Sequence, residues 1–507
     1  MRVSFAAFAF GLLIHHTLAK PSPMKPRRTS SILINPGALP DLPSLAEARS
    51  SFASGLNLDE IQGDILVGMK KNKELFFFFE ITDVAAFKSK LGTDIHDRIT
   101  PTAKMLDVAT QPVTAVNIAF SHSGLTALGV NVDDLLDTNF QMGQLEDAPT
   151  LGDPGTGNWV SAFVEQKVHG VFLLASDTQS NIDDELKSIQ TALGGSITEL
   201  HRLQGAARPG DQQGHEHFGY MDGVSQPAIE GFLDPEAGQF VAKPGAILLG
   251  EDGDGNMATR PSWTKSGSFL AFRQLKQRVP EFNKFVADNA LSVPGLSKQE
   301  NIDLFGARTV GRWKSGAPID LSPLRDDPVL GNDHTRNNNF TFDHPELSGF
   351  DVNTNQTLCP FSAHIAKIRP RAFLSVTLNV AHIMRAGIPY GPEVTDAEAA
   401  AQTSSDDPAL ERGLAFVAYQ SSLANGFTFL QRSWANNANF PKSNVGVDPI
   451  IGSTNSGPPG DAQRTITGLD PTNFQKPIVV NEDFVVSRGG EYFFSPPISA
   501  LINPLSQ

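Results

Sequence analysis

Residues 75–91 read Leu75-Phe76-Phe77-Phe78-Phe79-Glu80-Ile81-Thr82-Asp83-Val84-Ala85-Ala86-Phe87-Lys88-Ser89-Lys90-Leu91. The first five residues are all apolar, and a continuous apolar run of this length is typical of a strand. From residue 84 the apolar residues change to helical spacing, and Asp83 directly before them is a suitable N-cap. The stretch therefore predicts a strand that leads directly into a helix, a unit of mixed α and β folds.

The same kinds of segment recur in both halves of the chain. In the first half we expect strands at 113–120 and 168–175 and helices at 122–128, capped by Ser121, and 182–193. In the second half we expect strands at 269–275, 373–383 and 414–420 and helices at 279–290 and 423–434. Two halves with the same ingredients fit a duplicated α+β unit, although no repeat in the sequence proves a duplication.

Composition and charge exclude several classes of protein. The 507 residues are 40% hydrophobic and 19% charged, which is ordinary for a globular protein and excludes disordered and collagen-like chains. The formal net charge of -15 repels polyanions, and no dense block of Lys and Arg offsets it, so we expect no nucleic-acid partner. An acidic surface instead suits a soluble extracellular enzyme.

The N-terminus predicts secretion. Residues 1–19 have a positive charge at Arg2, a short apolar stretch at 5–14 and the small-residue sequence Thr17-Leu18-Ala19, as in a signal peptide. The stretch is too short to span a membrane, and a buried N-terminal helix is disfavoured because nothing amphipathic follows it. We expect a signal peptide at 1–19, a propeptide or N-terminal arm at 20–55 that is excluded from the fold, and no membrane partner.

The single cysteine is informative in a secreted chain. Cys359 has no partner for an intrachain disulfide, and no papain-type or caspase-type signature surrounds it, so a nucleophilic role is disfavoured. Two N-glycosylation sequons, which begin at Asn339 and Asn355, fall in a polar stretch where a surface loop is expected. Asn339 and Asn355 are candidate glycosylation sites.

The densest polar cluster is Gly214-His215-Glu216-His217-Phe218-Gly219-Tyr220-Met221-Asp222-Gly223-Val224-Ser225-Gln226-Pro227. Its glycines allow the backbone to approach a ligand closely. The segment also fits a plain polar turn in which Asp222 precedes Gly223. A third interpretation takes His215 and His217 as a metal-binding pair of a zinc or copper hydrolase, but further ligands are not evident.

Two later segments each contain one residue of interest. Residues 359–371 include His364, and a lone histidine in an apolar stretch is more often a hydrogen-bonded core residue than a ligand. Residues 381–391 read as an apolar strand that ends in a turn, where Arg385 also fits a surface ion pair. Neither segment indicates a function by itself.

Taken together, the three segments resemble the dye-decolorising peroxidase family. Residues 219–223 match its G-x-x-D-G haem-face motif, 359–371 look like its proximal-histidine segment, and 384–391 are similar to its distal-arginine segment. Further matches occur in order at 59–66, 413–422, 434–437 and 448–452, so the resemblance extends from about residue 58 to the C-terminus. Ala366 and Ala386 stand where the family commonly has basic residues, which puts the transfer of haem-propionate contacts in doubt.

The resemblance implies an α+β fold of two ferredoxin-like halves, each an antiparallel β-sheet flanked by helices, at 56–215 and 216–507. It also implies one haem b per chain, bound in the C-terminal half. By family match, His364 is the iron ligand, Asp448 accepts the other imidazole N–H, and Arg371 is the candidate for a propionate contact.

On the open face of the haem, the resemblance assigns proton transfer to Asp222 and charge stabilisation to Arg385. Leu414 and Phe416 are two residues apart and so lie on one strand face, where we expect them to wall this side and exclude water. A carboxylate has a reference pKa of about 3.9 and stays ionised where histidine is protonated, so we expect activity to be favoured at about pH 3 to 5.

The expected substrates are hydrogen peroxide and bulky aromatic compounds such as dyes, phenols and lignin-derived aromatics. Because bulky dyes do not reach a buried haem edge, the resemblance implies electron transfer through surface aromatics, with Tyr390 and Trp434 as candidates; alternatively both are simply packed rings. Other functions that we consider are a non-catalytic haem-binding protein on the same fold, the zinc or copper hydrolase, and a secreted adhesive protein. The oligomeric state is left open.

Overall fold

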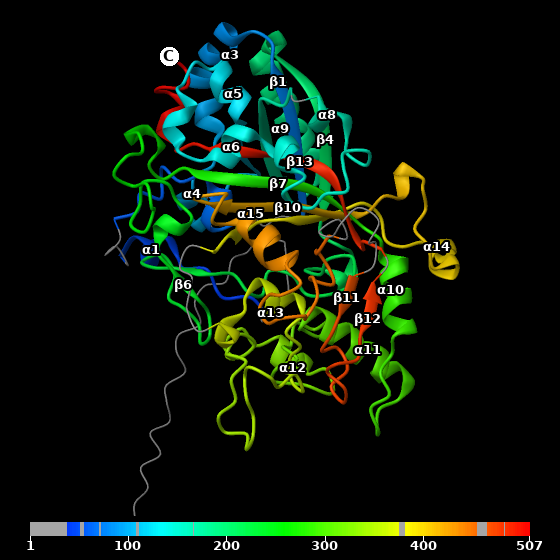
Figure 1. Cartoon of the computed structure of the whole chain (residues 1–507). Coiled ribbons are helices and arrows are strands. Elements are labelled where there is room, and N and C mark those ends of the chain that lie inside the picture. The colour runs from blue at the N-terminus through cyan, green and yellow to red at the C-terminus, as the bar shows by residue number, and fades with distance from the viewer. Residues whose placement is uncertain are drawn as a thin grey trace, which may run out of the picture.

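The computed structural model describes residues 38–50, 55–69, 72–107, 111–165, 167–374, 381–453, 464–480 and 482–507. At its centre is a nine-stranded sheet, surrounded by helices and by long irregular segments (Figure 1). No helix within these ranges combines the length and apolar character needed to cross a bilayer.

The first half of the sheet is one βαββαβ unit. Its elements are β1 (Lys73–Ile81), α3 (Val84–Lys90), β2 (Thr114–Ser121), β3 (Gly170–Ser176), α9 (Gln179–Leu193) and β4 (Ile197–Ala206). The strands are antiparallel in the order β2-β3-β1-β4, which is a ferredoxin-like arrangement. Strand β1 is buried on both faces, which explains its run of phenylalanines. The Asp83 carboxylate accepts a hydrogen bond from the Ala86 N–H at 3.0 Å and so caps α3 as predicted.

The second half of the sheet repeats this arrangement. Its elements are β7 (Ser268–Gln277), α10 (Val279–Asp288), β8 (Met384–Arg385), β9 (Ile388–Tyr390), β10 (Gly413–Gln420), α15 (Phe427–Phe429) and β13 (Val485–Ser495). Helix α15 continues into a π-helical turn, η10 (Leu430–Ala435). Strand β10 pairs with β7 on one side and with both β8 and β9 on the other, while β13 pairs with the far side of β7.

The two expected sheets join edge to edge and form a single closed barrel. Strand β13 pairs with β2, and β4 pairs with β9, both antiparallel. In the second of these pairings, a Cβ on Gly205 would lie 2.3 Å from Cγ2 of Ile388, so the close approach of the two halves requires glycine there. Phe76 and Phe78 of β1 belong to the apolar cluster inside the barrel, whereas the alternate residues Phe77 and Phe79 pack against the helices outside.

The rest of the second half packs around a third apolar cluster beside the barrel. The longer helices there are α10 and α11 (Lys298–Val310), and in Figure 1 they lie at the opposite end of the molecule from α3 and α9. The remaining helices are α1 (Leu45–Ser50), α2 (Gly63–Leu66), α4 (Thr102–Leu106), α5 (His122–Ala127), α6 (Thr138–Met142), α7 (Gln144–Asp147), α8 (Ser161–Val164), α12 (Pro328–Gly331), α13 (His364–Ile368) and α14 (Asp396–Ala401). The remaining strands are β5 (Ala228–Ile229), β6 (Val241–Ala242), β11 (Arg464–Ile466) and β12 (Ile478–Val480).

Several elements differ from the prediction. The strand expected at 373–383 falls partly on residues 375–380, outside the described residues, and its described ends are not strand; the strand begins at Met384 instead. The helix expected from 423 begins at Phe427. Strands β4 and β13 and helix α11 were not predicted: β4 lacks a continuous apolar run, and two glycines interrupt β13.

The N-terminal arm is not wholly outside the fold. Residues 1–37, which include the predicted signal peptide, and residues 51–54 lie outside the described part of the chain. In residues 38–50, however, Ala38 and Ala48 are buried, and the Asn337 side chain donates a hydrogen bond to the Ala38 carbonyl at 2.9 Å. The expectation that the arm is excluded from the fold is therefore wrong for this part, because its apolar side chains cover apolar groups of the body.

Candidate active site

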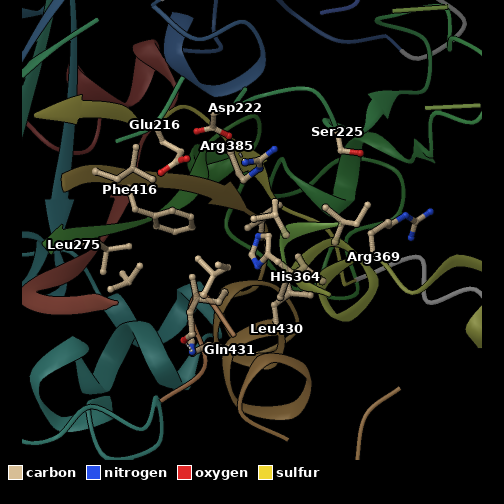
Figure 2. Close-up of a pocket in the computed structure, with 18 of the residues that line it drawn as sticks. Glu216, Asp222, Ser225, Leu275, His364, Arg369, Arg385, Phe416, Leu430 and Gln431 are labelled. Atoms are coloured by element: carbon tan, nitrogen blue, oxygen red, sulfur yellow. Dashed lines mark hydrogen bonds and ion pairs between the residues drawn. The ribbon is translucent and has the colours of Figure 1, made fainter. Parts of the chain in front are cut away.

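A cavity of about 340 Å³ lies beside the barrel in the second half of the chain. It is lined by parts of all three segments that the sequence singled out, together with residues of β10 and of the turn η10. Figure 2 shows side chains from these distant segments pointing into one space. The size is within the range of pockets that bind small molecules and cofactors.

On one side of the cavity, His364 is held by a buried carboxylate. His364 is the first residue of α13, and its Nδ1 lies 2.8 Å from Oδ2 of Asp448, which is fully buried. The other oxygen of Asp448 accepts hydrogen bonds from the N–H groups of Ile450 and Ile451, at 2.8 and 3.1 Å. Burial by itself would raise the pKa of Asp448, but His364 and these amide donors lower it. In the neutral ring, an ionised Asp448 keeps the proton on Nδ1, which leaves Nε2 as the lone-pair nitrogen.

Across the cavity, Asp222 and Arg385 form an ion pair. Nη1 of Arg385 lies 2.8 Å from Oδ1 of Asp222, and each side chain is about one third exposed, at 32% and 33% respectively. Arg385 is on β8, and Asp222 is on a loop between Gly219 and Gly223, whose φ angles of 92° and 79° favour glycine. The ion pair thus joins two segments that are 163 residues apart in the sequence.

The wall beside this ion pair is apolar. Leu414 and Phe416 on β10 both line the cavity, as their spacing predicted, while Ala415 and Val417 face the inside of the barrel. The Phe416 ring packs on Phe427, with centroids 5.6 Å apart. Such a wall lowers the local water content and strengthens electrostatic interactions in the cavity.

Besides Arg385 and Arg273, the arginines that line the cavity are Arg312, Arg369 and Arg371. Nη1 of Arg371 donates to the carbonyls of Gly238 and Asn338, each at 3.1 Å. Burial, together with repulsion from Arg312 and Arg369, lowers the pKa of Arg371 to about 9. A carboxylate of a bound ligand would relieve this repulsion.

The donor set fits a haem. The carboxylate-oriented imidazole of His364 lines the cavity, and a carboxylate–guanidinium pair faces it from another side. The walls are largely apolar, and three guanidiniums suit the propionates of the macrocycle. Arg371, the residue predicted for a propionate contact, is one of these three, and sequence reasoning missed Arg312 and Arg369.

Comparison with known proteins identifies the family. Residues 60–209 match the family model of the DyP dimeric alpha+beta barrel domain, and residues 251–445 match that of the Dyp-type peroxidase C-terminal domain. The chain belongs to the DyP-type peroxidase family. Peroxidase 2 of Mycetinis scorodonius is 58% identical over 518 residues, which cover 100% of both chains. A dye-decolorizing peroxidase of Auricularia auricula-judae is 51% identical over 96% of this chain and 94% of its own. A crystal structure of the fungal DyP-type peroxidase from that organism has a TM-score of 0.84 at 52% identity, and covers 90% of this chain and 100% of that chain.

DyP-type peroxidases are haem-dependent, so the fit of the cavity agrees with the family. Two of the three interpretations that compete with a peroxidase are thereby set aside: the non-catalytic haem-binding protein and the adhesive protein. The metal hydrolase is also wrong. Nε2 of His217 lies 2.9 Å from the Tyr390 carbonyl, and burial lowers the pKa of His217 to about 4. Among the described residues, no three His, Cys, Asp or Glu side chains are grouped so that they could bind a metal ion.

The placement of the two candidate relay aromatics corrects one expectation. Tyr390 and Trp434 are each only 4% exposed, so neither is a surface residue. The Tyr390 hydroxyl donates to Oε1 of Glu411 at 2.9 Å, and the Trp434 ring stacks on Phe440. Sequence periodicity did not reveal this burial: Tyr390 packs in the apolar cluster of the barrel, and Trp434 packs between Phe429 and Phe440 in a separate small cluster.

The structure also places Cys359 and the two sequon asparagines. Cys359 is buried, and burial raises the pKa of its thiol well above the usual value, which disfavours a nucleophilic thiolate. Of the two sequon asparagines, Asn339 is exposed and Asn355 is partly buried.

Proposed function

We propose that Asp222, Arg385, His364 and Asp448 are the working residues of a haem peroxidase that uses hydrogen peroxide to oxidise dyes and other bulky aromatic compounds. The bound haem supplies the redox chemistry, in which peroxide is reduced and aromatic molecules are then oxidised one electron at a time. The observation that carries this proposal is the Asp222–Arg385 ion pair in the same cavity as an imidazole that a buried carboxylate orients.

His364 would hold the cofactor through Nε2. The Asp448 carboxylate orients the ring. It also makes Nε2 more electron-rich, because the hydrogen bond that Nδ1–H donates to the carboxylate gives the ring partial imidazolate character. Arg312, Arg369 and Arg371 would bind the propionates. These contacts bind and orient the cofactor and leave the Asp222 side of the cavity for peroxide.

Asp222 and Arg385 would act on peroxide as a pair. The carboxylate takes a proton from one oxygen of hydrogen peroxide and returns it to the other oxygen as the O–O bond breaks, so that water leaves. The guanidinium stabilises the negative charge that develops on the departing oxygen. Leu414 and Phe416 exclude water from this step.

The test is peroxide turnover by haem-loaded variants. Asp222→Asn should lower kcat/KM for hydrogen peroxide by about 10²- to 10⁴-fold, as expected for loss of a general acid–base residue. Because the two residues act as a unit, the loss of kcat/KM in the double variant with Arg385→Leu should be much smaller than the product of the losses in the two single variants. Equal haem content, measured by absorbance, is the control. Turnover of Asp222→Asn within a few-fold of wild type would overturn the assignment.

We also propose that the protein is secreted, that its N-terminus is processed, and that the fold divides into two halves. The charged, apolar and small-residue pattern of residues 1–19 supports export, and a propeptide or arm would occupy 20–55. The two ferredoxin-like units support halves at 56–215 and 216–507. N-terminal sequencing of protein collected from culture medium would locate the processing point, and mass spectrometry before and after deglycosylation would test Asn339 and Asn355.

A further inference from the structure

Arg385 lies on a strand whose outer side has no neighbouring strand in the described part of the chain. Strand β8 has two residues and is at the end of the sheet order, where β10 is its partner among the described strands. The N–H of Ala386 donates to the Val417 carbonyl of β10, so the main-chain groups of Arg385 point away from β10. An edge strand of this kind leaves an N–H and a C=O that need another partner.

The side chain of Gln226 supplies that partner. Its Oε1 accepts a hydrogen bond from the Arg385 N–H at 3.2 Å, and its Nε2 donates a short hydrogen bond to the Arg385 carbonyl. The Gln226 amide therefore satisfies both main-chain groups of one residue, as a residue on a neighbouring strand would.

Gln226 belongs to the same loop as Asp222, and this loop is held firmly at other points. The Gln226 carbonyl accepts from Nε2 of Gln239 at 3.0 Å. On the other side, Ser225 donates to Oδ1 of Asn338 at 2.8 Å, and Nδ2 of Asn338 donates to the Val224 carbonyl at 2.7 Å. The loop thus contacts Arg385 twice: Asp222 binds its guanidinium and Gln226 binds its main chain.

We propose that Gln226 is a positioning residue of the peroxidase, which sets the distance between the Asp222 carboxylate and the Arg385 guanidinium by fixing the main chain of Arg385 to the Asp222 loop. The proposal rests on the proposed roles of Asp222 and Arg385. Gln226 itself transfers no proton. Small displacements within a catalytic pair cost large factors in rate, so the loss of this amide should be visible in turnover.

The first variant is Gln226→Met, which has a similar length but neither hydrogen bond. In the haem-loaded protein, kcat/KM for hydrogen peroxide should fall by about 10- to 100-fold, with unchanged haem content, because the ion pair loses its geometry. Wild-type turnover in a folded, haem-loaded Gln226→Met protein would overturn the proposal.

The second variant, Gln226→Glu, separates positioning from general stability. A protonated carboxyl group can supply one donor and one acceptor, which are the two groups that the Gln226 amide uses toward Arg385, whereas a carboxylate has no donor and repels the Arg385 carbonyl. Turnover of Gln226→Glu should therefore be close to wild type at about pH 3.5 and should fall at least about tenfold relative to wild type by about pH 6, because the reference pKa of glutamate is about 4.3. A loss of equal size at both pH values would overturn the proposal.

Gln204→Glu is the matched control for the added charge. Gln204 is also partly buried, and its Nε2 donates to the main-chain carbonyls of Glu74 and Gly205, but it lines neither cavity. The ratio of its turnover to that of wild type should change little between the two pH values. If Asp222→Asn were harmless, the proposed function would fail; if only the Gln226 variants were harmless, the positioning role alone would fail.

Discussion

The buried rings of Trp434 and Tyr390 are the candidates for electron transfer between the cavity and bulky substrates. Trp434 follows Leu430 and Gln431, which line the cavity, within the same turn η10, and its ring lies 4.9 Å from that of Phe440 at an interplanar angle of 7°. Tyr390 donates to Glu411, and burial raises the pKa of its phenol. A phenol that loses an electron becomes strongly acidic, and Glu411 is placed to take that proton.

We predict that these two rings transfer electrons from bulky substrates toward the cavity. Trp434→Phe and Tyr390→Phe should each slow oxidation of a large dye by about tenfold, equivalent to about 1.4 kcal/mol of barrier, while oxidation of a small phenol changes little. Steady-state rates with both substrates would measure this. Equal losses on both substrates would mean that the rings serve packing alone.

At the scale of elements, the N-terminal arm covers part of the site. A second cavity, of about 100 Å³, is lined by Asp222, Gly223 and Arg385 and also by Leu39 of the arm. Next to Leu39, Ala38 packs in an apolar cluster with Met221 and Val224, which flank Asp222 and Gly223. Removal of the arm would therefore uncover this side of the ion pair.

The prediction concerns the entry of small ligands. A haem-loaded chain that begins at residue 55 should bind cyanide faster than the full-length chain, by roughly threefold or more, since cover over a site sets the rate of ligand entry. Stopped-flow absorbance would measure the rate. In the full-length chain, Leu39→Ala should reproduce part of the effect. Leu42→Ala is the control, because Leu42 packs on the barrel cluster and does not line this cavity. Identical rates for all four proteins would contradict the prediction.

At the scale of the whole molecule, packing and charge affect how stability depends on pH. Desolvation raises the pKa of Glu491, on β13, to about 7, although its carboxylate accepts hydrogen bonds from the N–H groups of Gln144 and Tyr492. The folded state then holds this proton more tightly than the unfolded chain does. Its stabilising contribution is present below about pH 4.5 and is lost as the pH rises through about 7.

Glu491→Gln should reduce the dependence of folding stability on pH, since glutamine resembles the protonated side chain of glutamate. Relative to wild type, the variant should gain about 3 kcal/mol in free energy of unfolding between pH 4.5 and 7.5. Urea unfolding at the two pH values would give the difference between the proteins, which cancels the contributions of other titrating groups. A difference that is the same at both pH values would contradict the assigned pKa.

The sequence by itself determined the local elements and the chemistry. The apolar run 75–79, the cap at Asp83 and the two-residue spacing of Leu414 and Phe416 each depend on neighbours in the chain, and each is found where it was expected. The resemblance of three segments to a known family indicated His364, Asp222 and Arg385, whereas residue type alone also fitted a core histidine, a polar turn and a surface ion pair. Tertiary structure alone decided the joining of two sheets into one barrel, the burial of Tyr390 and Trp434, and the hold of Gln226 on Arg385. These features depend on contacts between segments up to several hundred residues apart, and the packing and strand register that create such contacts leave no local pattern in the sequence.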